Sequence, residues 1–214
     1  MHFHVVDMDS DIDGAVPHCS NINISNLTLL GENFSFAQIS TGIHINKASN
    51  VVITGNIITH ASVAGIAVGS DCDNVVISNN ICSDGASWHG DGISLHHNTS
   101  RRVIVSGNVC HRNNRGIDIG SSGATIVGND CQDNTEGIRL TANAHNIISG
   151  NLCKRGNGAA GGYANHHHTI NIAFGAQNNF IIANHIPGKA VNNASGNTTN
   201  TVTQNKHLAT ATGW

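Results

Sequence analysis

The sequence is poor in several residue types, and each shortage excludes a class of protein. Charged residues make up 11% of the 214 residues, aromatic residues make up 4%, and there are two prolines. No apolar run approaches the ~18 residues that a membrane-spanning helix requires, so we expect no membrane partner. A net charge of −3 gives no electrostatic basis for binding nucleic acid.

Glycine, by contrast, is abundant at 24 residues, and it marks an internal repeat. Each copy reads Gly-Ile-x-Ile, a short polar turn, an apolar triplet and then Gly-Asn. The repeat glycines are Gly42, Gly65, Gly92, Gly116 and Gly137, and the repeat asparagines are Asn56, Asn80, Asn108, Asn129, Asn151 and Asn184. The copies recur at about 21 to 33 residues, a period typical of solenoids whose units cannot bury their own apolar faces.

This repeat predicts an all-β fold, a right-handed parallel β-helix in which a single chain winds through about seven coils. We expect residues 1–214 to form one β-helix domain that is a fragment of a longer chain. Residues 190–214 carry a weaker copy of the repeat and are predicted to be a fading C-terminal coil or tail.

Aligned columns of the repeat predict which side chains point inward. Two residues after each asparagine stand Ile58, Cys82, Cys110, Cys131, Cys153 and Ile186, and one residue after stand Ile57, Ile81, Val109, Asp130, Leu152 and His185. Because the Asp and His favour solvent and side chains alternate along a strand, the cysteines are predicted to face the core. We expect them to be reduced, and we expect the asparagines to bond from coil to coil.

Histidine is frequent at 15 residues, but its arrangement does not predict a metal site. Neighbouring side chains of an extended strand point to opposite faces, so consecutive histidines seldom converge on one ion. The sequence has no C-x-x-C spacing of the kind that builds zinc sites on thiols. We therefore expect neither a metal nor another cofactor.

Two connections, residues 83–91 and 154–168, are longer than the others. Insertions in a solenoid lie on one face, often the binding face. Trp88 lies in the first connection and Tyr163, the only tyrosine, lies in the second. With His89, these residues are candidate substrate-binding groups, because aromatic rings can stack on sugar rings. The alternative is that the two aromatic residues only anchor long loops to the helix.

Ionisable residues gather between these two connections. The catalytic candidates are Asp91, Asp118, Glu136 and His96, and the candidate ligands for a substrate carboxylate are Arg115 and Arg139. Carboxyl groups and histidine serve as general acids and bases, and arginine binds carboxylates through two parallel hydrogen bonds. The alternative is structural, because the signs alternate from coil to coil and would form a ladder of salt bridges without any chemistry.

The Gly-Ile-x-Ile and Val-x-Ile-x-Gly-Asn repeat over residues 20–190 resembles the pectate-lyase-like β-helix superfamily, which includes pectinases, alginate epimerases and phage tailspike depolymerases. Residues 92–99, Gly-Ile-Ser-Leu-His-His-Asn-Thr, are similar to the Gly-Phe-Asp-Pro-His-Glu-Gln-Thr segment of mannuronan epimerases, with Ser94 where that family has its catalytic aspartate. Residues 89–93 are similar to the Asn-Thr-Asp-Gly strand of polygalacturonases, which implies a catalytic role for Asp91.

The resemblance implies a protein that engages, and can cleave, a polysaccharide in a groove on the flank of the helix. Cleavage would be that of a tailspike-like depolymerase or of a pectin-lyase-like hydrolase or lyase. The alternative is a non-catalytic fibre, adhesin or carbohydrate-binding module. The resemblance further implies an extracellular or virion-associated location, and a homotrimer if the chain is tailspike-like.

Overall fold

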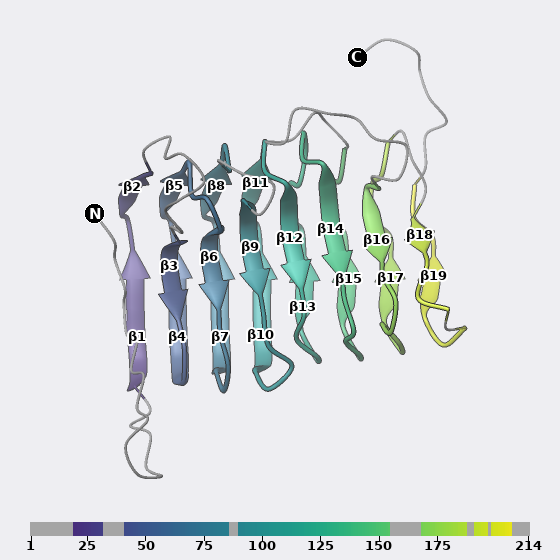
Figure 1. The fold of residues 1–214 in the computed structure, drawn as a ribbon, viewed down its shortest axis with the longest axis horizontal. Helices are drawn as coiled ribbons and strands as arrows, with labels where there is room; N and C mark the ends of the chain where they lie inside the picture. Colours follow the sequence, from purple (N-terminus) through teal and green to yellow (C-terminus); the bar gives the residue numbers. More distant parts are fainter. Residues whose placement is uncertain are drawn as a thin grey trace.

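The computed structural model describes residues 19–31, 41–85, 90–154, 168–187, 191–196 and 198–206. Regular structure in these residues consists of β strands, which lie side by side along one long axis (Figure 1). None of the described residues forms a helix long and apolar enough to cross a membrane. The strands build three parallel sheets, so the predicted all-β parallel solenoid is confirmed.

The three sheets are named A, B and C. Sheet A has eight strands: β1 (Cys19–Ser25), β4 (Ala48–Thr54), β7 (Asp73–Ser78), β10 (Arg101–Ser106), β13 (Thr125–Val127), β15 (Ile147–Ser149), β17 (Phe180–Ile182) and β19 (Thr201–Thr203). Sheet B has four: β2 (Thr28–Leu30), β5 (Ile57–Thr59), β8 (Ile81–Ser83) and β11 (Val109–His111). Sheet C has seven: β3 (Thr41–Ile45), β6 (Ala64–Val68), β9 (Asp91–Leu95), β12 (Arg115–Ile119), β14 (Glu136–Leu140), β16 (Ile170–Ile172) and β18 (Asn192–Asn193).

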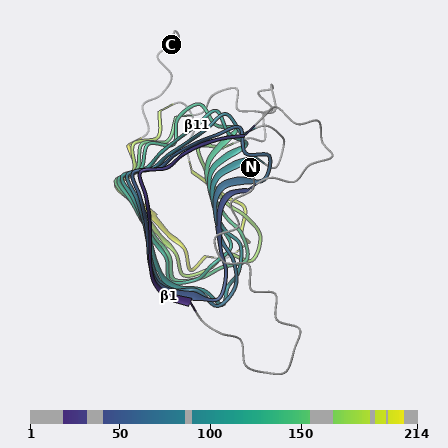
Figure 2. The same ribbon diagram turned by 90° about the vertical axis from the view of Figure 1, so that its left-hand side faces the viewer.

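The chain passes through sheets A, B and C in turn and repeats this path on every coil. Viewed nearly along the long axis, the coils superimpose on one another (Figure 2). Beyond β11, sheet B continues as single bridges that join Val109 to Asp130 and Asp130 to Leu152. Equivalent residues of successive coils therefore lie side by side at the ~4.8 Å spacing of hydrogen-bonded strands.

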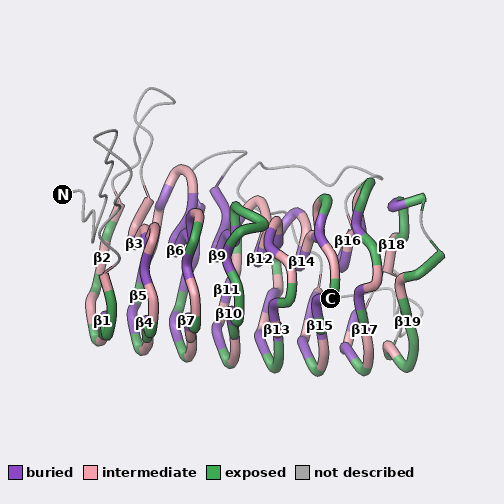
Figure 3. Tube along the Cα trace, turned by 90° about the horizontal axis from the view of Figure 1, so that it is seen from below, coloured by how far each residue is buried: buried purple, intermediate pink, exposed green. Residues whose placement is uncertain are grey.

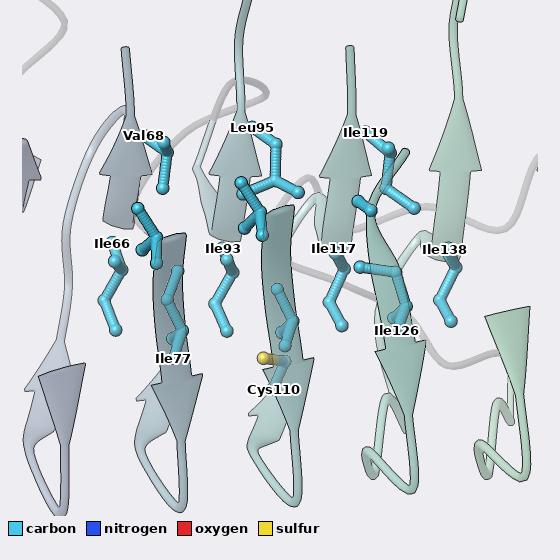
Figure 4. Close-up of a cluster of buried hydrophobic side chains, with 14 of the residues drawn as sticks. Ile66, Val68, Ile77, Ile93, Leu95, Cys110, Ile117, Ile119, Ile126 and Ile138 are labelled. Atoms are coloured by element: carbon cyan, nitrogen blue, oxygen red, sulfur yellow. The ribbon is translucent and has the colours of Figure 1, made fainter. Parts of the chain in front are cut away.

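Stacked aliphatic side chains fill the interior of the coils (Figure 4). The inward pairs of sheet C that are at most 1% exposed are Ile43/Ile45, Ile66/Val68, Ile93/Leu95, Ile117/Ile119, Ile138/Leu140 and Ile170/Ile172. The inward stack of sheet A that is fully buried is Ile53, Ile77, Val105, Ile126, Ile148 and Ile181. In Figure 3 buried segments alternate with intermediate and exposed ones along the middle coils. Each buried side chain contributes roughly 1.5–3 kcal/mol, so these stacks are the main source of stability.

The cysteine column lies in the core as predicted. Cys82, Cys110, Cys131 and Cys153 are free thiols with no exposed surface, and Cys82 pairs in register with Cys110. A hydrogen bond with the Cys110 thiol, followed by burial, raises the pKa of Cys82 well above its ordinary value. The four buried thiols act as small apolar side chains.

The asparagine ladder is also confirmed. The Asn56 amide donates to the Oδ1 atom of Asn80 at 2.9 Å, and the Asn108 amide donates to that of Asn129 at 3.0 Å. A second buried ladder, which the sequence reading missed, joins Asn146, Asn179 and Asn200 in the same way. The side-chain amides thus supply partners for the polar groups of the turns, which burial would otherwise leave unpaired.

The backbone at the Gly-Asn turns refines the sequence interpretation. The left-handed residue is the one before the ladder asparagine, as at Gly107 (φ 63°) and Gly128 (φ 64°), whereas the asparagines themselves are not left-handed. The glycine before each Ile-x-Ile strand has a different role. A Cβ atom on Gly116 would lie 2.5 Å from the backbone oxygen of Gly137 on the next coil, so only glycine permits this close approach.

Candidate functional site

The outward face of sheet C carries the ionisable residues in two adjacent rows. Arg115 pairs in register with Glu136, and Asp118 pairs with Arg139 on the same two strands. Asp91 begins the preceding strand, β9, whose Ser94 pairs with Asp118. Equivalent residues on successive coils are neighbours, so Arg115 lies beside Glu136 and Asp118 lies beside Arg139.

Arg115 lies at the centre of this group and contacts three carboxyl groups. One of its Nη atoms lies 3.4 Å from Asp91 and 3.3 Å from Asp118, and its Nε atom lies 3.8 Å from Glu136. The side chain of Asp91 is 4% exposed, against 12% for Glu136 and 20% for Asp118. The alternating residues therefore form one connected cluster around the Arg115 guanidinium rather than isolated groups.

Burial makes this cluster unusual electrostatically. Burial, together with the nearby Asp118, raises the pKa of Asp91 to about 8 despite the attraction of Arg115. Burial also raises the pKa of Glu136, although a hydrogen bond from the Asn171 amide at 2.8 Å opposes the rise. Asp91 is therefore protonated at neutral pH, which leaves fewer negative charges around one guanidinium.

A pocket of about 390 Å³ opens beside this cluster, at the carboxyl ends of β9, β12 and β14. Its lining comprises Leu95, His96, His97, Asn98, Asp118, Gly120, Arg139, Thr141 and Ala142. Of the predicted site residues, the pocket thus brings together His96, Asp118 and Arg139. Asp91, Arg115 and Glu136 start these strands and are not part of the lining. The sequence analysis placed the candidate site over the whole row of strands, and it did not anticipate this pocket at the strand ends.

Several buried polar atoms of the pocket residues have no hydrogen-bond partner among the described residues. They are Asp118 Oδ1, Arg139 Nε and Thr141 Oγ1. An unpaired buried polar atom costs roughly 1–3 kcal/mol, so a polar ligand that reaches these groups after small side-chain rotations would gain from pairing them. The polar residues four positions after the repeat glycines, His96 and Thr141, were the signal in the sequence for this pocket, with Gly120 between them.

His96 stands at the edge of the pocket, with its ring partly exposed to solvent. Its Nδ1 atom lies 3.3 Å from the Ser94 hydroxyl. Burial of the rest of the ring lowers the pKa of His96, and this effect exceeds the opposing attraction of Asp118. At neutral pH the ring is therefore uncharged and able to accept a proton.

The three remaining predicted binding residues, Trp88, His89 and Tyr163, lie outside the described residues. Their predicted position on the rims of the site stays a prediction.

Two known protein families together match most of the chain. Residues 11–127 match the family described as right-handed beta helix region, and residues 86–213 match the family described as periplasmic copper-binding protein (NosD). No curated protein matches the chain in sequence.

Solved structures of carbohydrate-active enzymes share the fold. DFA-IIIase from Arthrobacter chlorophenolicus A6, solved in complex with GF2, is 17% identical with a TM-score of 0.70, over 92% of this chain and 59% of that chain. The A-module of mannuronan C-5 epimerase AlgE4 from Azotobacter vinelandii is 16% identical (TM-score 0.66, 92% and 58%). Alginate lyase from Paenibacillus sp. str. FPU-7 is also 16% identical (TM-score 0.66, 89% and 73%). The chain thus spans little more than half of two of these proteins, and such low identity shows the fold alone.

The described residues do not fit a copper site made of several protein ligands. Among them, no group of three or more His, Cys, Asp or Glu side chains could hold a metal ion. Copper favours thiol ligands, but the four thiols of the repeat column, Cys82, Cys110, Cys131 and Cys153, are sealed in the core. His166 and His167 lie outside the described residues. The described residues therefore offer no counterpart to the copper site that the family description names.

Proposed function

The chain belongs to the right-handed β-helix family and to the NosD family, and from this fold we propose that it binds a polysaccharide in the sheet C pocket and cleaves it. The observation that carries the proposal is the convergence of His96, Asp118 and Arg139 on one open pocket of about 390 Å³. Structures with the same fold include enzymes whose names and bound ligands are those of carbohydrate chemistry.

The pocket has the size and lining for a sugar. A volume of about 390 Å³ lies in the range of small-ligand sites, and Leu95 and Ala142 give it an apolar part. Asn98 and Thr141 offer hydrogen-bonding groups suited to sugar hydroxyls. Arg139 offers a planar guanidinium that pairs well with a carboxylate. These features together favour a polysaccharide that contains acidic sugar units.

The same residues favour elimination over hydrolysis. Hydrolysis of a glycosidic bond ordinarily needs two carboxyl groups at the substrate, and in the pocket Asp118 is the only one among the described lining residues. In elimination, a base removes the proton from the carbon beside the carboxylate, a double bond forms, and the glycosidic oxygen on the next carbon leaves. Uncharged His96 is suited to take that proton, and Arg139 is suited to stabilise the negative charge that develops on the carboxylate.

The Arg115 cluster would then act behind the pocket. One oxygen of Asp118 is held by Arg115 at 3.3 Å, and Asp91 and Glu136 hold Arg115 in turn. We therefore assign Asp91 and Glu136 the role of fixing Asp118 and the strand ends, in place of the direct catalytic role that the sequence suggested.

A non-catalytic binding module is the second candidate. It is favoured by the ion pairs themselves, because carboxylates that are engaged by a guanidinium can serve structure alone. In that case the pocket would bind a saccharide without breaking a glycosidic bond, and replacing His96 would change no cleavage rate.

A panel of acidic and neutral polysaccharides tests the proposal, with reducing ends and the absorbance of unsaturated products measured together. We expect both signals on an acidic polysaccharide, and we expect His96→Ala to lower the rate ~10²–10⁴-fold while binding persists. Arg139→Ala should weaken binding of the acidic polymer. Reducing ends without unsaturated product would indicate hydrolysis, binding without either signal would support the binding module, and no binding at all would refute the pocket assignment.

A further inference from the structure

We propose that Ser94 is the positioning residue for His96, accepting the Nδ1–H of the imidazole and leaving the Nε2 atom unprotonated for the pocket. This inference rests on the proposed function in that it assigns His96 as the base. It concerns a residue that lines no part of the pocket itself.

The geometry of β9 brings the two side chains together. Ser94 and His96 are two residues apart, so they point to the same outward face of sheet C. The Ser94 hydroxyl lies 3.3 Å from the Nδ1 atom of His96. Ser94 is 1% exposed, whereas His96 extends outward and is exposed. The hydroxyl thus holds the inner nitrogen of the ring and leaves the outer part of the ring free.

The neighbours of Ser94 on the adjacent coils leave it free for this role. Ala67, its partner on β6, has no polar side-chain atom, and Asp118, its partner on β12, is engaged by Arg115. The second oxygen of Asp118 has no hydrogen-bond partner among the described residues. Among the described residues, Ser94 and His96 each form one side-chain hydrogen bond, and it is the bond between them.

A serine at this position also sets which form of the ring is stable. A hydroxyl is neutral, so it can accept from Nδ1–H without stabilising the charged imidazolium, whereas a carboxylate would favour the charged form. The charged and titratable groups that surround the ring are His44 from β3, His97 from the following turn, Asp118 and Arg115 from β12, and Arg139 across the pocket. Of the first four, only Asp118 favours the charged form, and burial outweighs it.

Nuclear magnetic resonance of protein with ¹⁵N-labelled histidine tests this without any substrate, because long-range proton–nitrogen correlations identify which ring nitrogen carries the proton. In the native protein at neutral pH we expect His96 in the Nδ1–H form. In Ser94→Ala we expect that preference to be lost, with the Nε2–H form becoming the major one. His97 provides the internal control, and Ser106→Ala, on the outward face of sheet A, provides a matched variant that should change neither ring.

A second variant makes the test independent of small packing changes. Ser94→Asp should raise the pKa of His96 by about 1 to 3, because it places a carboxylate against Nδ1. Native His96 in the Nε2–H form, or a Ser94→Ala spectrum identical to the native one, would overturn the inference. Failure of the proposed function shows itself differently: His96→Ala would leave cleavage unchanged, while the tautomer and its dependence on Ser94 would stand.

Discussion

Arg115 shows how single residues determine the electrostatics of the candidate site. Three carboxyl groups surround its guanidinium, and they differ in how far they are buried. Asp91 is the most buried of the three, and this burial is the main cause of the rise of its pKa to about 8. Asp118 is the most exposed, and it faces the pocket. Burial thus separates Asp91, which is enclosed beside Arg115, from Asp118, whose side chain a ligand in the pocket can reach.

The proton on Asp91 predicts how stability depends on pH. Its pKa is about 8 in the folded protein, against an ordinary value of 3.8, so between these values the folded state binds one proton more than the unfolded state. This contribution is complete below about pH 4 and is lost as pH rises toward 8, with a slope of at most ~1.4 kcal/mol per pH unit. We expect Asp91→Asn to flatten the fall in urea midpoint over this range.

Asp84 supplies a control of opposite sign. Hydrogen bonding with Arg112 lowers the pKa of Asp84 to about 2, so its stabilisation is present above about pH 4 and is lost as pH falls toward 2. Asp84→Asn should lower stability near neutral pH and leave the slope between pH 4 and 8 unchanged. Parallel curves for native protein and Asp91→Asn would contradict the assigned pKa of Asp91.

The repeat predicts which residues of the candidate site are neighbours, but it does not predict all of their side-chain contacts. The pairing of Asp118 with Arg139 was predictable, because strand alternation and coil length fix register. The contact of Arg115 with three acids at once was not, because the direction of a long flexible side chain depends on its rotamer. The shape of the pocket also depends on His97, Asn98 and Ala142, which follow the periodic column and so could not be placed from the repeat.

At the scale of the elements, the turns carry as much information as the strands. Each Gly-Asn turn combines a left-handed residue with an asparagine whose side chain bonds the next coil. The amide of Asn129 also donates to the backbone oxygen of Val105 at 2.9 Å, and its Oδ1 atom accepts from the backbone nitrogen of Asn108 at 3.0 Å. The same amide donates to the Oδ1 atom of Asn151 on the following coil at 3.0 Å, so one side chain pairs with polar groups on the coils before and after it, which explains why asparagine recurs at this position.

Asn129→Ala should therefore lower the free energy of unfolding substantially, although it removes no apolar side chain. It leaves the backbone N–H and the amide of Asn108 without their acceptor in a buried turn. At about 1–3 kcal/mol for each unpaired buried group, we expect a loss of roughly 2–5 kcal/mol in the free energy of unfolding, measured by urea titration. The matched control is Asn23→Ala, an exposed residue on β1, which should stay within about 0.5 kcal/mol of the native protein. Equal effects of the two changes would disprove the ladder as a stabilising element.

At the scale of the whole molecule, stability is the sum of contacts between neighbouring coils. Each inward residue packs against its equivalents on the coils before and after it, as Ile117 does between Ile93 and Ile138. One column of buried side chains runs from Ile24 to Ile186, but each layer packs against its neighbouring coils, and the two ends of the solenoid lie far apart in Figure 1. A change in the middle coils therefore breaks contacts on both sides, whereas a change near an end can be absorbed by local fraying.

This difference can be measured with one substitution made at two places. Ile117 is fully buried on β12, and Ile186 is 2% exposed on the last coil of its column that the structure describes. Ile117→Ala should cost on the order of 2–5 kcal/mol, because it opens a cavity between two rigid neighbours. Ile186→Ala removes the same atoms where few coils follow, so we expect a smaller shift in the urea midpoint. Hydrogen exchange should agree, with faster exchange throughout the solenoid in Ile117→Ala and only around β17 and β19 in Ile186→Ala. Equal midpoint losses would mean that the coils unfold as one unit with uniform coupling, which contradicts stability built from nearest-neighbour contacts.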